Sequence, residues 1–151
     1  MQNQKQMSKE KIAFVKAHEG QHIEGNISGL GAWLNAKILS VNEKTGMLQL
    51  EFEVRPDMLN PMSSLHGGAI SAILDESMGM QLFVLSEDRA YYATSLQLDF
   101  VRAAFEGQKV IAQPELIRIG KRSANMRCLL LDQEGKVLAH GSSNYLQIPS
   151  S

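Results

Sequence analysis

The sequence predicts an α+β fold: a curved, antiparallel, six-stranded sheet wrapped around one long central helix, with a further helix at the N-terminus. Residues 47–55 alternate strictly between apolar and polar side chains, which is typical of a strand with one buried face. Residues 68–85 are apolar on nearly every side of a helix, which indicates a buried helix. Four strand-like segments with short turns follow, and a curved sheet would give the helix a surface to lie in.

The N-terminal third is expected to hold one helix and the first strand. Ser8 can cap a helix over residues 9–19, where apolar side chains recur near helical spacing. Glycines break this pattern into a loop between residues 20 and 31. Residues 32–41 alternate like a strand, and residues 42–46 form the hairpin loop that leads into the strand at 47–55.

The rest of the chain supplies the central helix and the remaining strands. A loop over residues 56–65 leads into the helix, which ends near residue 85. Pro114 interrupts one of the later strands and predicts a bulge or an edge position there. The four strands are expected at residues 91–101, 109–119, 123–132 and 137–148.

Length and composition indicate one domain with a true core. The chain has 151 residues, and we expect an N-terminal extension over residues 1–28 before a domain over residues 29–151. The net charge of −1 favours neither a nucleic-acid partner nor a membrane surface. The single cysteine, Cys128, excludes an internal disulfide and fits a reducing compartment. With a polar N-terminus that lacks an apolar signal core, this predicts a cytoplasmic protein.

Residues 60–79 hold the candidate catalytic groups. Gly67 and Gly68 begin the central helix, and their bare backbone N–H groups can approach a ligand closely. About two turns later come Asp75 and Glu76, the only carboxylates of this apolar helix. The sequence therefore predicts an active site here, formed by the helix start, which can bind a polarised group, and by the lone pair of acidic residues.

The same residues carry a family resemblance. His66-Gly67-Gly68 at the head of the helix, with Asp75 nine residues after the histidine, resembles the hotdog-fold thioesterases, most closely the phenylacetate-pathway (PaaI-type) branch. Asn60 corresponds to the family's active-site asparagine, and the Gly-Lys-Arg turn at residues 120–122 resembles a family turn. The resemblance extends over residues 29–148 and implies a hotdog fold for the domain at 29–151.

The sequence departs from the family pattern in two places. Many relatives have Arg-Pro-Ala after the third strand, where this chain has Arg-Ala-Ala at residues 102–104. The family often has a serine or threonine early in that strand to assist the nucleophile, and the corresponding position here is Ala93 or Thr94. Thr94 or Ser95 could therefore supply the hydroxyl that contacts substrate.

The resemblance implies an acyl-CoA thioesterase that needs neither a cofactor nor a metal. Asp75 would act as nucleophile or as general base on water, while the N–H of Gly67 or Gly68 polarises the thioester carbonyl. Asn60 could hold the attacking water or the carbonyl, and Lys121 and Arg122 could bind the phosphates of CoA.

Two residues keep alternative roles. His66 either caps and orients the loop or acts directly in the chemistry. Glu76 is interpreted as a structural or rim charge, with replacement of the catalytic acid as the alternative.

Helix geometry adds a requirement for two subunits. His66 and Asp75 are nine residues apart, which places them about half a turn out of phase and about 13 Å apart along the axis. One helix therefore cannot easily bring Gly67 and Asp75 to the same carbonyl, whereas two antiparallel copies can. This predicts a two-fold homodimer with shared sites, in agreement with the resemblance, which would also fit a homotetramer of two dimers.

Other functions remain open at this point. An acyl carrier protein could replace CoA, or the chain could be a non-catalytic acyl-CoA-binding module that senses its ligand. Residues 18–22 match the zinc-protease pattern H-E-x-x-H, but Gly20 lies inside it, so we expect the helix to end there and no metal to bind. The identity of the acyl group cannot be read from the sequence.

Overall fold

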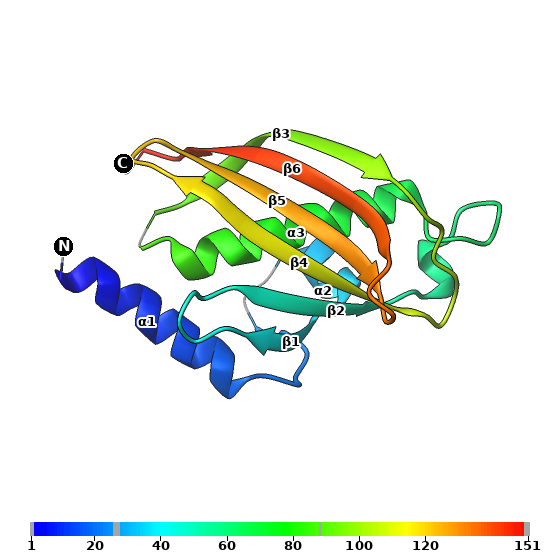
Figure 1. Cartoon of the computed structure of the whole chain (residues 1–151), viewed down its shortest axis with the longest axis horizontal. Coiled ribbons are helices and arrows are strands. Elements are labelled where there is room, and N and C mark those ends of the chain that lie inside the picture. Colours follow the sequence, from blue (N-terminus) through cyan, green and yellow to red (C-terminus); the bar gives the residue numbers. More distant parts are fainter. Residues whose placement is uncertain (1, 26–27, 88, 150–151) are drawn as a thin grey trace.

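The protein is an α+β domain with one six-stranded antiparallel sheet wrapped around α3 (Figure 1). The computed structural model describes residues 2–25, 28–87 and 89–149. The strand order is β1-β2-β4-β5-β6-β3. This confirms the predicted fold class. The elements are α1 (Gln2–Ala17), α2 (Gly29–Leu34), β1 (Lys37–Val41), β2 (Leu48–Glu53), the 3-10 turn η1 (Pro56–Met58), α3 (Gly67–Leu85), β3 (Tyr91–Phe100), β4 (Lys109–Ile119), β5 (Ser123–Asp132) and β6 (Val137–Gln147).

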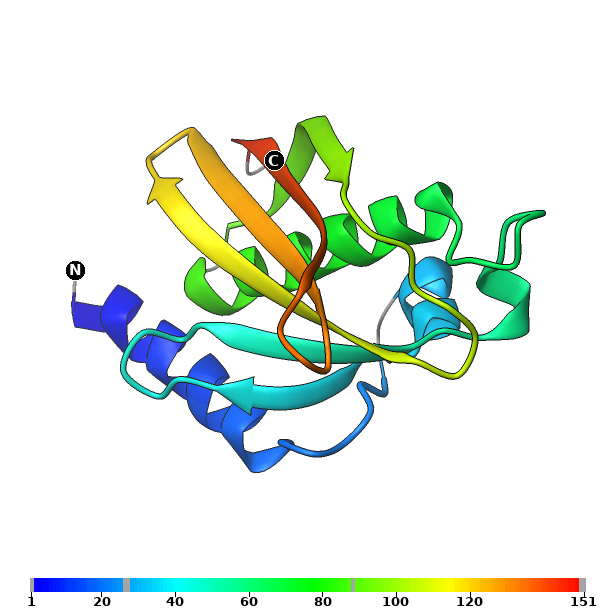
Figure 2. The same cartoon turned by 45° about the vertical axis from the view of Figure 1, so that its right-hand side comes forward.

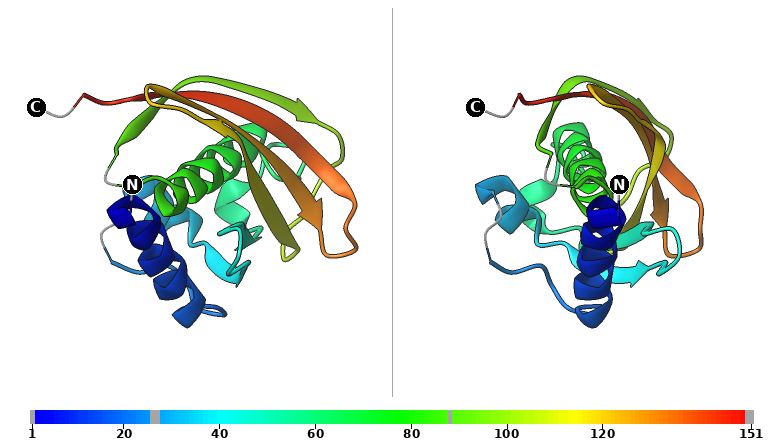
Figure 3. Two further views of the ribbon diagram at one scale, coloured as in Figure 1. Left: turned by 60° about the vertical axis from the view of Figure 1, so that its left-hand side comes forward. Right: turned by 90° about the vertical axis from the view of Figure 1, so that its left-hand side faces the viewer.

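The core lies between the inner face of the sheet and α3. Side chains alternate between buried and more exposed along β2 and β5, as period-two strands require. They meet α3 residues that are fully enclosed, including Ile73, Leu74 and Met78. Figure 3 shows the sheet curving over α3, with α1 beneath it against β1 and β2. The inward residues of the two strands are Leu48, Leu50 and Phe52 of β2 and Ala124, Met126, Cys128 and Leu130 of β5.

The central helix is confirmed, but it is not enclosed on every side. Phe83 is 64% exposed, and Asp75 and Gly79, which precede it at four-residue intervals, are only partly buried. The prediction of all-round burial was wrong because this stripe faces a cavity instead of the sheet. By length and composition alone α3 could cross a membrane, a property that core helices of globular proteins share.

The N-terminal helix begins earlier than the sequence predicted. It starts at Gln2, so Ser8 is not its cap, and the Ser8 hydroxyl instead donates to the Leu85 carbonyl at 3.4 Å. Lys11 Nζ donates to the carbonyls of Phe83 and Ser86, at 3.0 and 2.6 Å. A cation suits these last carbonyls of a helix. Packing across the end of α3 thus holds α1 in place, which local spacing could not show.

Residues 32–41 were also predicted wrongly as one strand. The first part belongs to the short helix α2, and only Lys37–Val41 is a strand. The Ser28 hydroxyl caps α2 by accepting the Gly31 N–H at 2.9 Å, and Asn35, at φ 54°, ends it. Leu34, Ala36 and Ile38 are buried at a spacing of two residues, which imitates a strand across the end of α2.

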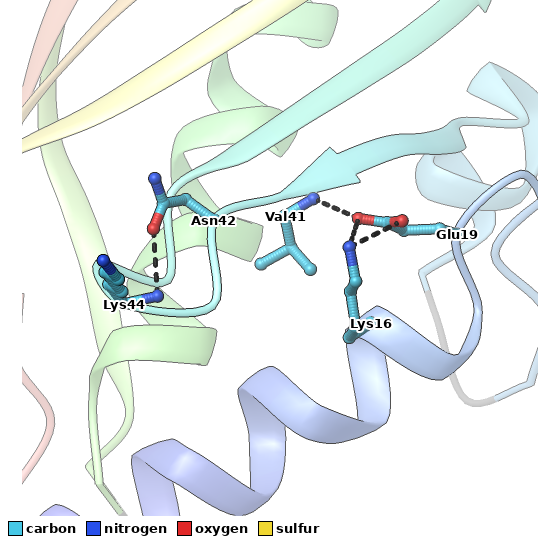
Figure 4. Close-up of polar contacts among 5 residues, drawn as sticks. All are labelled: Lys16, Glu19, Val41, Asn42 and Lys44. Carbon is cyan, nitrogen blue, oxygen red and sulfur yellow. Dashed lines mark hydrogen bonds and ion pairs between the residues drawn. The ribbon is translucent and has the colours of Figure 1, made fainter.

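The end of α1 is tied to the sheet by a carboxylate (Figure 4). Glu19 accepts the Val41 N–H at 2.8 Å and pairs with Lys16 at 3.0 Å. In the following hairpin, the Asn42 side chain accepts the Lys44 N–H at 2.9 Å and the loop closes at Gly46, which has a φ of 73°. This confirms the predicted loop between the first two strands.

Strand β3 forms one edge of the sheet and pairs only with β6. Its side chains are mostly exposed on both faces, with Leu96 and Phe100 among the exposed apolar residues. An exposed apolar edge of this length is a typical site for pairing with another chain. The predicted bulge or edge position at Pro114 was wrong, because β4 is an internal strand and its register shift lies between Leu116 and Arg118. The proline is accommodated because it lies just beyond the last β2–β4 pair, Leu50 with Ala112.

Candidate active site

A cavity of about 850 Å³ lies beside the second half of α3. Its walls come from α1, α3 and the inner face of the sheet. Figure 2 shows α1 beside α3. Most of the lining is apolar, which suits an acyl group. The titratable residues that line it are Glu10 and Lys11 of α1, Asp75 and Glu76 of α3 and Tyr145 of β6.

Asp75 is one of the two α3 carboxylates that line this cavity. Its carboxylate is partly buried and has no hydrogen-bond or ion-pair partner among the residues described. Burial raises its pKa above the ordinary aspartate value because the charged form loses water. A carboxylate held without a partner, beside an apolar cavity, is suited to accept a proton or to attack an electrophile.

Glu76 lies on the neighbouring side of α3, toward α2. A Cβ built on Gly31 would lie 2.6 Å from Glu76 Oε1, so only glycine lets α2 approach the carboxylate this closely. Burial raises the pKa of Glu76, and the nearby Asp75 carboxylate raises it further.

The start of α3 forms a second polar centre. His66 is the N-cap, and its Nδ1 accepts the Gly68 N–H at 2.8 Å. The Gly68 N–H is thus occupied, whereas the Gly67 N–H has no partner among the residues that the structure describes. A Cβ on Gly67 would lie 3.2 Å from the Phe100 ring. Of the two glycines, Gly67 is the one with an N–H open to a ligand.

The Asn60 side chain organises the loop before the helix. Its Oδ1 accepts the N–H groups of Met62 and Ser64 at 3.0 and 3.1 Å, and its Nδ2 donates to Ser64 Oγ at 2.9 Å. This is an Asx-type turn. In this structure the Asn60 amide therefore makes its hydrogen bonds within its own loop.

The structure does not bring the two centres together within one chain. Asn60, His66, Gly67 and Gly68 do not line the cavity that contains Asp75. Gly67 and Asp75 are eight residues apart on one helix, or about 12 Å along its axis.

Strand β3 places its hydroxyl groups away from the cavity. The register between Ala93 and Ser95 shifts by one residue, so Thr94 is the extra residue of a bulge. The Thr94 hydroxyl donates to the Asn144 carbonyl at 3.2 Å, and Ser95 Oγ accepts from Asn144 Nδ2 at 3.0 Å. Ala93, not Thr94 or Ser95, lines the cavity.

Lys121 and Arg122 lie in the exposed turn between β4 and β5. Lys121 lines a separate cavity of about 270 Å³ at the end of α3, together with Arg89. Two cations at one surface hollow can attract a phosphate group.

One residue of the cavity was missed in the sequence. Tyr145 lies on the inner face of β6 and is 4% exposed. Its hydroxyl has no hydrogen-bond partner among the residues described. The sequence of β6 has no apolar alternation that marks this position, because Gly141 and Ser143 precede Tyr145 at a spacing of two residues.

The H-E-x-x-H pattern does not form a helical metal site. Helix α1 ends at Ala17, so both histidines follow it. His18 Nδ1 lies 2.7 Å from the Phe14 carbonyl, and His22 Nδ1 lies 3.1 Å from the Asn35 carbonyl. Across residues 2–25, 28–87 and 89–149, no three His, Cys, Asp or Glu residues are grouped as metal ligands would be.

Comparisons with known proteins agree on one family. The sequence profile of the thioesterase superfamily matches residues 62–139. A candidate esterase of Archaeoglobus fulgidus is 26% identical over 106 residues, which are 70% of this chain and 66% of that protein. The chain therefore aligns with just under two thirds of that relative's length.

Solved structures share the fold. The PaaI protein of the Escherichia coli phenylacetic acid degradation operon has a TM-score of 0.77 at 19% identity, covering 95% of this chain and 96% of that one. A phenylacetic acid degradation-related protein of Ralstonia eutropha JMP134 has a TM-score of 0.73 at 27% identity, covering 82% and 92%. A hypothetical thioesterase of Streptococcus pneumoniae TIGR4, solved with coenzyme A, has a TM-score of 0.70 at 16% identity, covering 77% and 88%.

Proposed function

Because this chain belongs to the thioesterase superfamily, we propose that it hydrolyses acyl-CoA thioesters at the cavity that holds Asp75. The observation that carries this proposal is the Asp75 carboxylate, which is partly buried, has no partner in the described chain and lies in a largely apolar cavity. A module that only bound acyl-CoA would gain nothing from such a group, since burying an unpaired carboxylate is unfavourable.

The reaction needs an attacking group and a group that polarises the carbonyl. In one route Asp75 removes a proton from water as the water oxygen attacks the thioester carbon. The C–S bond then breaks and the proton passes to the departing sulfur, giving the free acid and the CoA thiol. In the other route the Asp75 carboxylate attacks the thioester carbon and the C–S bond breaks to release the CoA thiolate. Water then hydrolyses the resulting anhydride to the free acid, restoring the Asp75 carboxylate and leaving one proton for the thiolate.

The Gly67 N–H is the proposed donor to the carbonyl oxygen. It lies at the positive end of the α3 dipole and has no described partner, so it can stabilise developing negative charge. The N–H of Gly68 is bound to His66 in this structure, which favours Gly67 over Gly68.

A shared site follows from the distance between the two centres. We propose a two-fold homodimer in which Gly67 of one subunit and Asp75 of the other meet one thioester. The exposed apolar edge of β3 is the proposed interface, because Leu96, Phe100 and Val101 are left uncovered there. Light scattering should give the mass of a dimer or a higher even assembly, and an active monomer would contradict shared sites.

CoA is the proposed carrier of the acyl group. The solved thioesterase of Streptococcus pneumoniae TIGR4 contains coenzyme A, and Lys121 and Arg122 provide exposed cations here for CoA phosphates. Their replacement by alanine should raise KM for acyl-CoA with little change in kcat. If an acyl carrier protein is the true carrier, acyl-CoA should be a poor substrate even when Lys121 and Arg122 are both present.

Thiol release from aromatic, short-chain and long-chain acyl-CoAs tests the activity. The wild type should hydrolyse at least one of them, and Asp75→Asn should not. Binding without turnover would favour the sensing module. Equal rates for Asp75→Asn and wild type would refute the assignment of Asp75.

A single-turnover reaction in heavy-oxygen water tests the nucleophilic route. If Asp75 attacks the thioester and water then attacks the aspartyl carbonyl of the anhydride, the Asp75 carboxylate gains heavy oxygen, and mass spectrometry of the peptide that contains it will detect the label. Label in the released acid alone fits general-base catalysis as well as water attack on the acyl carbonyl of the anhydride, so only label in Asp75 is decisive.

A further inference from the structure

Gly79 lies in the middle of α3, where the packing of the described chain does not require a glycine. A Cβ built at this position would meet no described atom within 4 Å. Alanine would therefore fit, and it would stabilise the interior of the helix relative to glycine. Gly79 follows Asp75 by one turn on the same face of α3, and both residues line the cavity. The absent side chain thus leaves open space beside the carboxylate, at a cost to helix stability.

Two helices border this space with one face each. The α3 residues of the lining extend over about three turns, from Asp75 to Val84, and the α1 residues extend over nearly two turns, from Glu10 to Val15. Within both sets the residues recur at intervals of four, which places them on one side of their helix. Between the charged residues the lining of the two helices is apolar, with Met80 and Val84 on α3 and Phe14 and Val15 on α1.

The apolar lining continues well beyond the carboxylate. Phe83 follows Asp75 by eight residues, or about 12 Å along the helix axis. There α1 meets α3, because the Lys11 ammonium lies 4.3 Å from the centre of the Phe83 ring and donates to the Phe83 carbonyl at 3.0 Å. A short acyl group or a single aromatic ring would fill only the part of the cavity nearest Asp75. An extended alkyl chain would follow the lining past Gly79.

We propose that the cavity between α1 and α3 receives a straight aliphatic acyl chain of medium length, such as decanoyl, and that Gly79 determines this specificity. This inference rests on the proposed function and names the substrate class of the same site. The thioester carbon lies at Asp75, and the alkyl chain extends along α3 toward Phe83. Glycine at position 79 keeps the path of the chain open, and the apolar side chains of the two helices remove its methylene groups from water.

Hydrolysis of propanoyl-, hexanoyl- and decanoyl-CoA measures the specificity. In the wild type, kcat/KM should rise with chain length, because each buried methylene group is favourable. Gly79→Leu puts a branched side chain in the path, so kcat/KM for decanoyl-CoA should fall on the order of 100-fold, while that for propanoyl-CoA stays within about threefold. Gly79→Ala should fall between the two. The melting temperature should stay the same or rise in both variants, since leucine and alanine favour a helix more than glycine does.

A second glycine provides the matched control. Gly29 begins α2 and is not among the described residues that line the cavity, and a Cβ built on it would also meet no described atom within 4 Å. Gly29→Leu should therefore keep the dependence on chain length that the wild type shows.

A variant of α1 tests the opposite wall of the cavity. Phe14 lines the cavity and is 66% exposed, so its replacement leaves the core intact. Phe14→Ala should lower kcat/KM for decanoyl-CoA about tenfold and leave that for propanoyl-CoA unchanged.

The outcomes separate this inference from the proposed function. If Gly79→Leu keeps wild-type activity on decanoyl-CoA, or loses activity on all three substrates equally, the role of Gly79 is overturned, while an inactive Asp75→Asn leaves the function standing. Loss of the wild-type mass of Gly79→Leu in light scattering would assign the open space to a partner subunit and would also overturn it. A wild type that hydrolyses aromatic acyl-CoAs but not decanoyl-CoA would refute the substrate class alone. If it hydrolyses no acyl-CoA, the proposed function fails, and this inference fails with it.

Discussion

The imidazole Nδ1 of His66 accepts the backbone N–H of Gly68 at 2.8 Å and so closes the start of α3. Asparagine caps helices at least as well as most residues, whereas alanine cannot cap. We therefore expect His66→Asn to keep wild-type stability and activity, and His66→Ala to lower the free energy of unfolding by about 0.5–2 kcal/mol. Urea unfolding and thiol release measure the two effects. A stable but inactive His66→Asn would show that the imidazole takes part in the chemistry.

The close approach of α2 to Glu76 predicts a coupling between Gly31 and Glu76. Alanine in place of a helical glycine adds about 0.5–1 kcal/mol of stability, but here the new Cβ would displace the Glu76 carboxylate. We expect Gly31→Ala to change the stability of the wild type little and to stabilise the Glu76→Ala variant. Denaturant unfolding of the four proteins of this double-mutant cycle gives the coupling. An equal effect of Gly31→Ala in both backgrounds would contradict the contact.

The raised pKa of Asp75 predicts opposite effects on stability and activity. Burial raises the pKa of Asp75 on folding above its unfolded value of 3.8. The charged carboxylate therefore destabilises the native state once the pH exceeds the unfolded pKa, and the full destabilisation is reached above the folded pKa. Asp75→Asn should therefore melt at a higher temperature than wild type near neutral pH while losing activity.

The pH dependence provides the control for this prediction. The difference in melting temperature between the two proteins should shrink as pH falls and vanish below the unfolded pKa, where both side chains are neutral. A difference that is independent of pH would mean that burial of the charge is not its cause.

Shared sites predict complementation between two inactive variants. Asp75→Asn lacks the attacking group, and Gly67→Val places side-chain atoms toward the Phe100 ring at the N–H centre. Unfolding and refolding them together should form mixed dimers with one intact and one doubly damaged site. Random mixing should restore about a quarter of the wild-type activity.

The double variant Asp75→Asn/Gly67→Val, mixed with wild type, serves as the control for exchange of subunits. If the two single variants exchange subunits but stay inactive, each site lies within one chain.

The sequence predicted most of the secondary structure, because periodicity is a local property. The alternation in β2 gives the correct buried face, and the predicted bounds of α3 and β5 are nearly correct. The family assignment is confirmed, since His66, Gly67 and Asp75 keep motif spacing along a chain whose profile match covers residues 62–139. The catalytic roles, the dimer, the boundary after residue 28 and a cytoplasmic location stay predictions.

Tertiary structure decided the place of α1 and the cavity. Lys11 of α1 donates to a carbonyl at the end of α3, a contact between segments far apart in the sequence. Helix α2 has local signals, the Ser28 cap and the left-handed turn at Asn35, which the strand-like alternation of residues 32–41 concealed.

The hydroxyl group of the active site shows the division most clearly. From the sequence alone, Thr94 and Ser95 were as plausible as any residue of β3, because a strand pattern does not reveal its bulges. One extra residue at Thr94 turns both hydroxyls toward β6 and leaves Ala93 facing the cavity. The pairing of Ala93 with Tyr145 then brings a hydroxyl from a strand some fifty residues away. The sequence by itself determined the fold and the family, whereas strand register in three dimensions decided that Ala93 and Tyr145, not Thr94 or Ser95, line the cavity with Asp75.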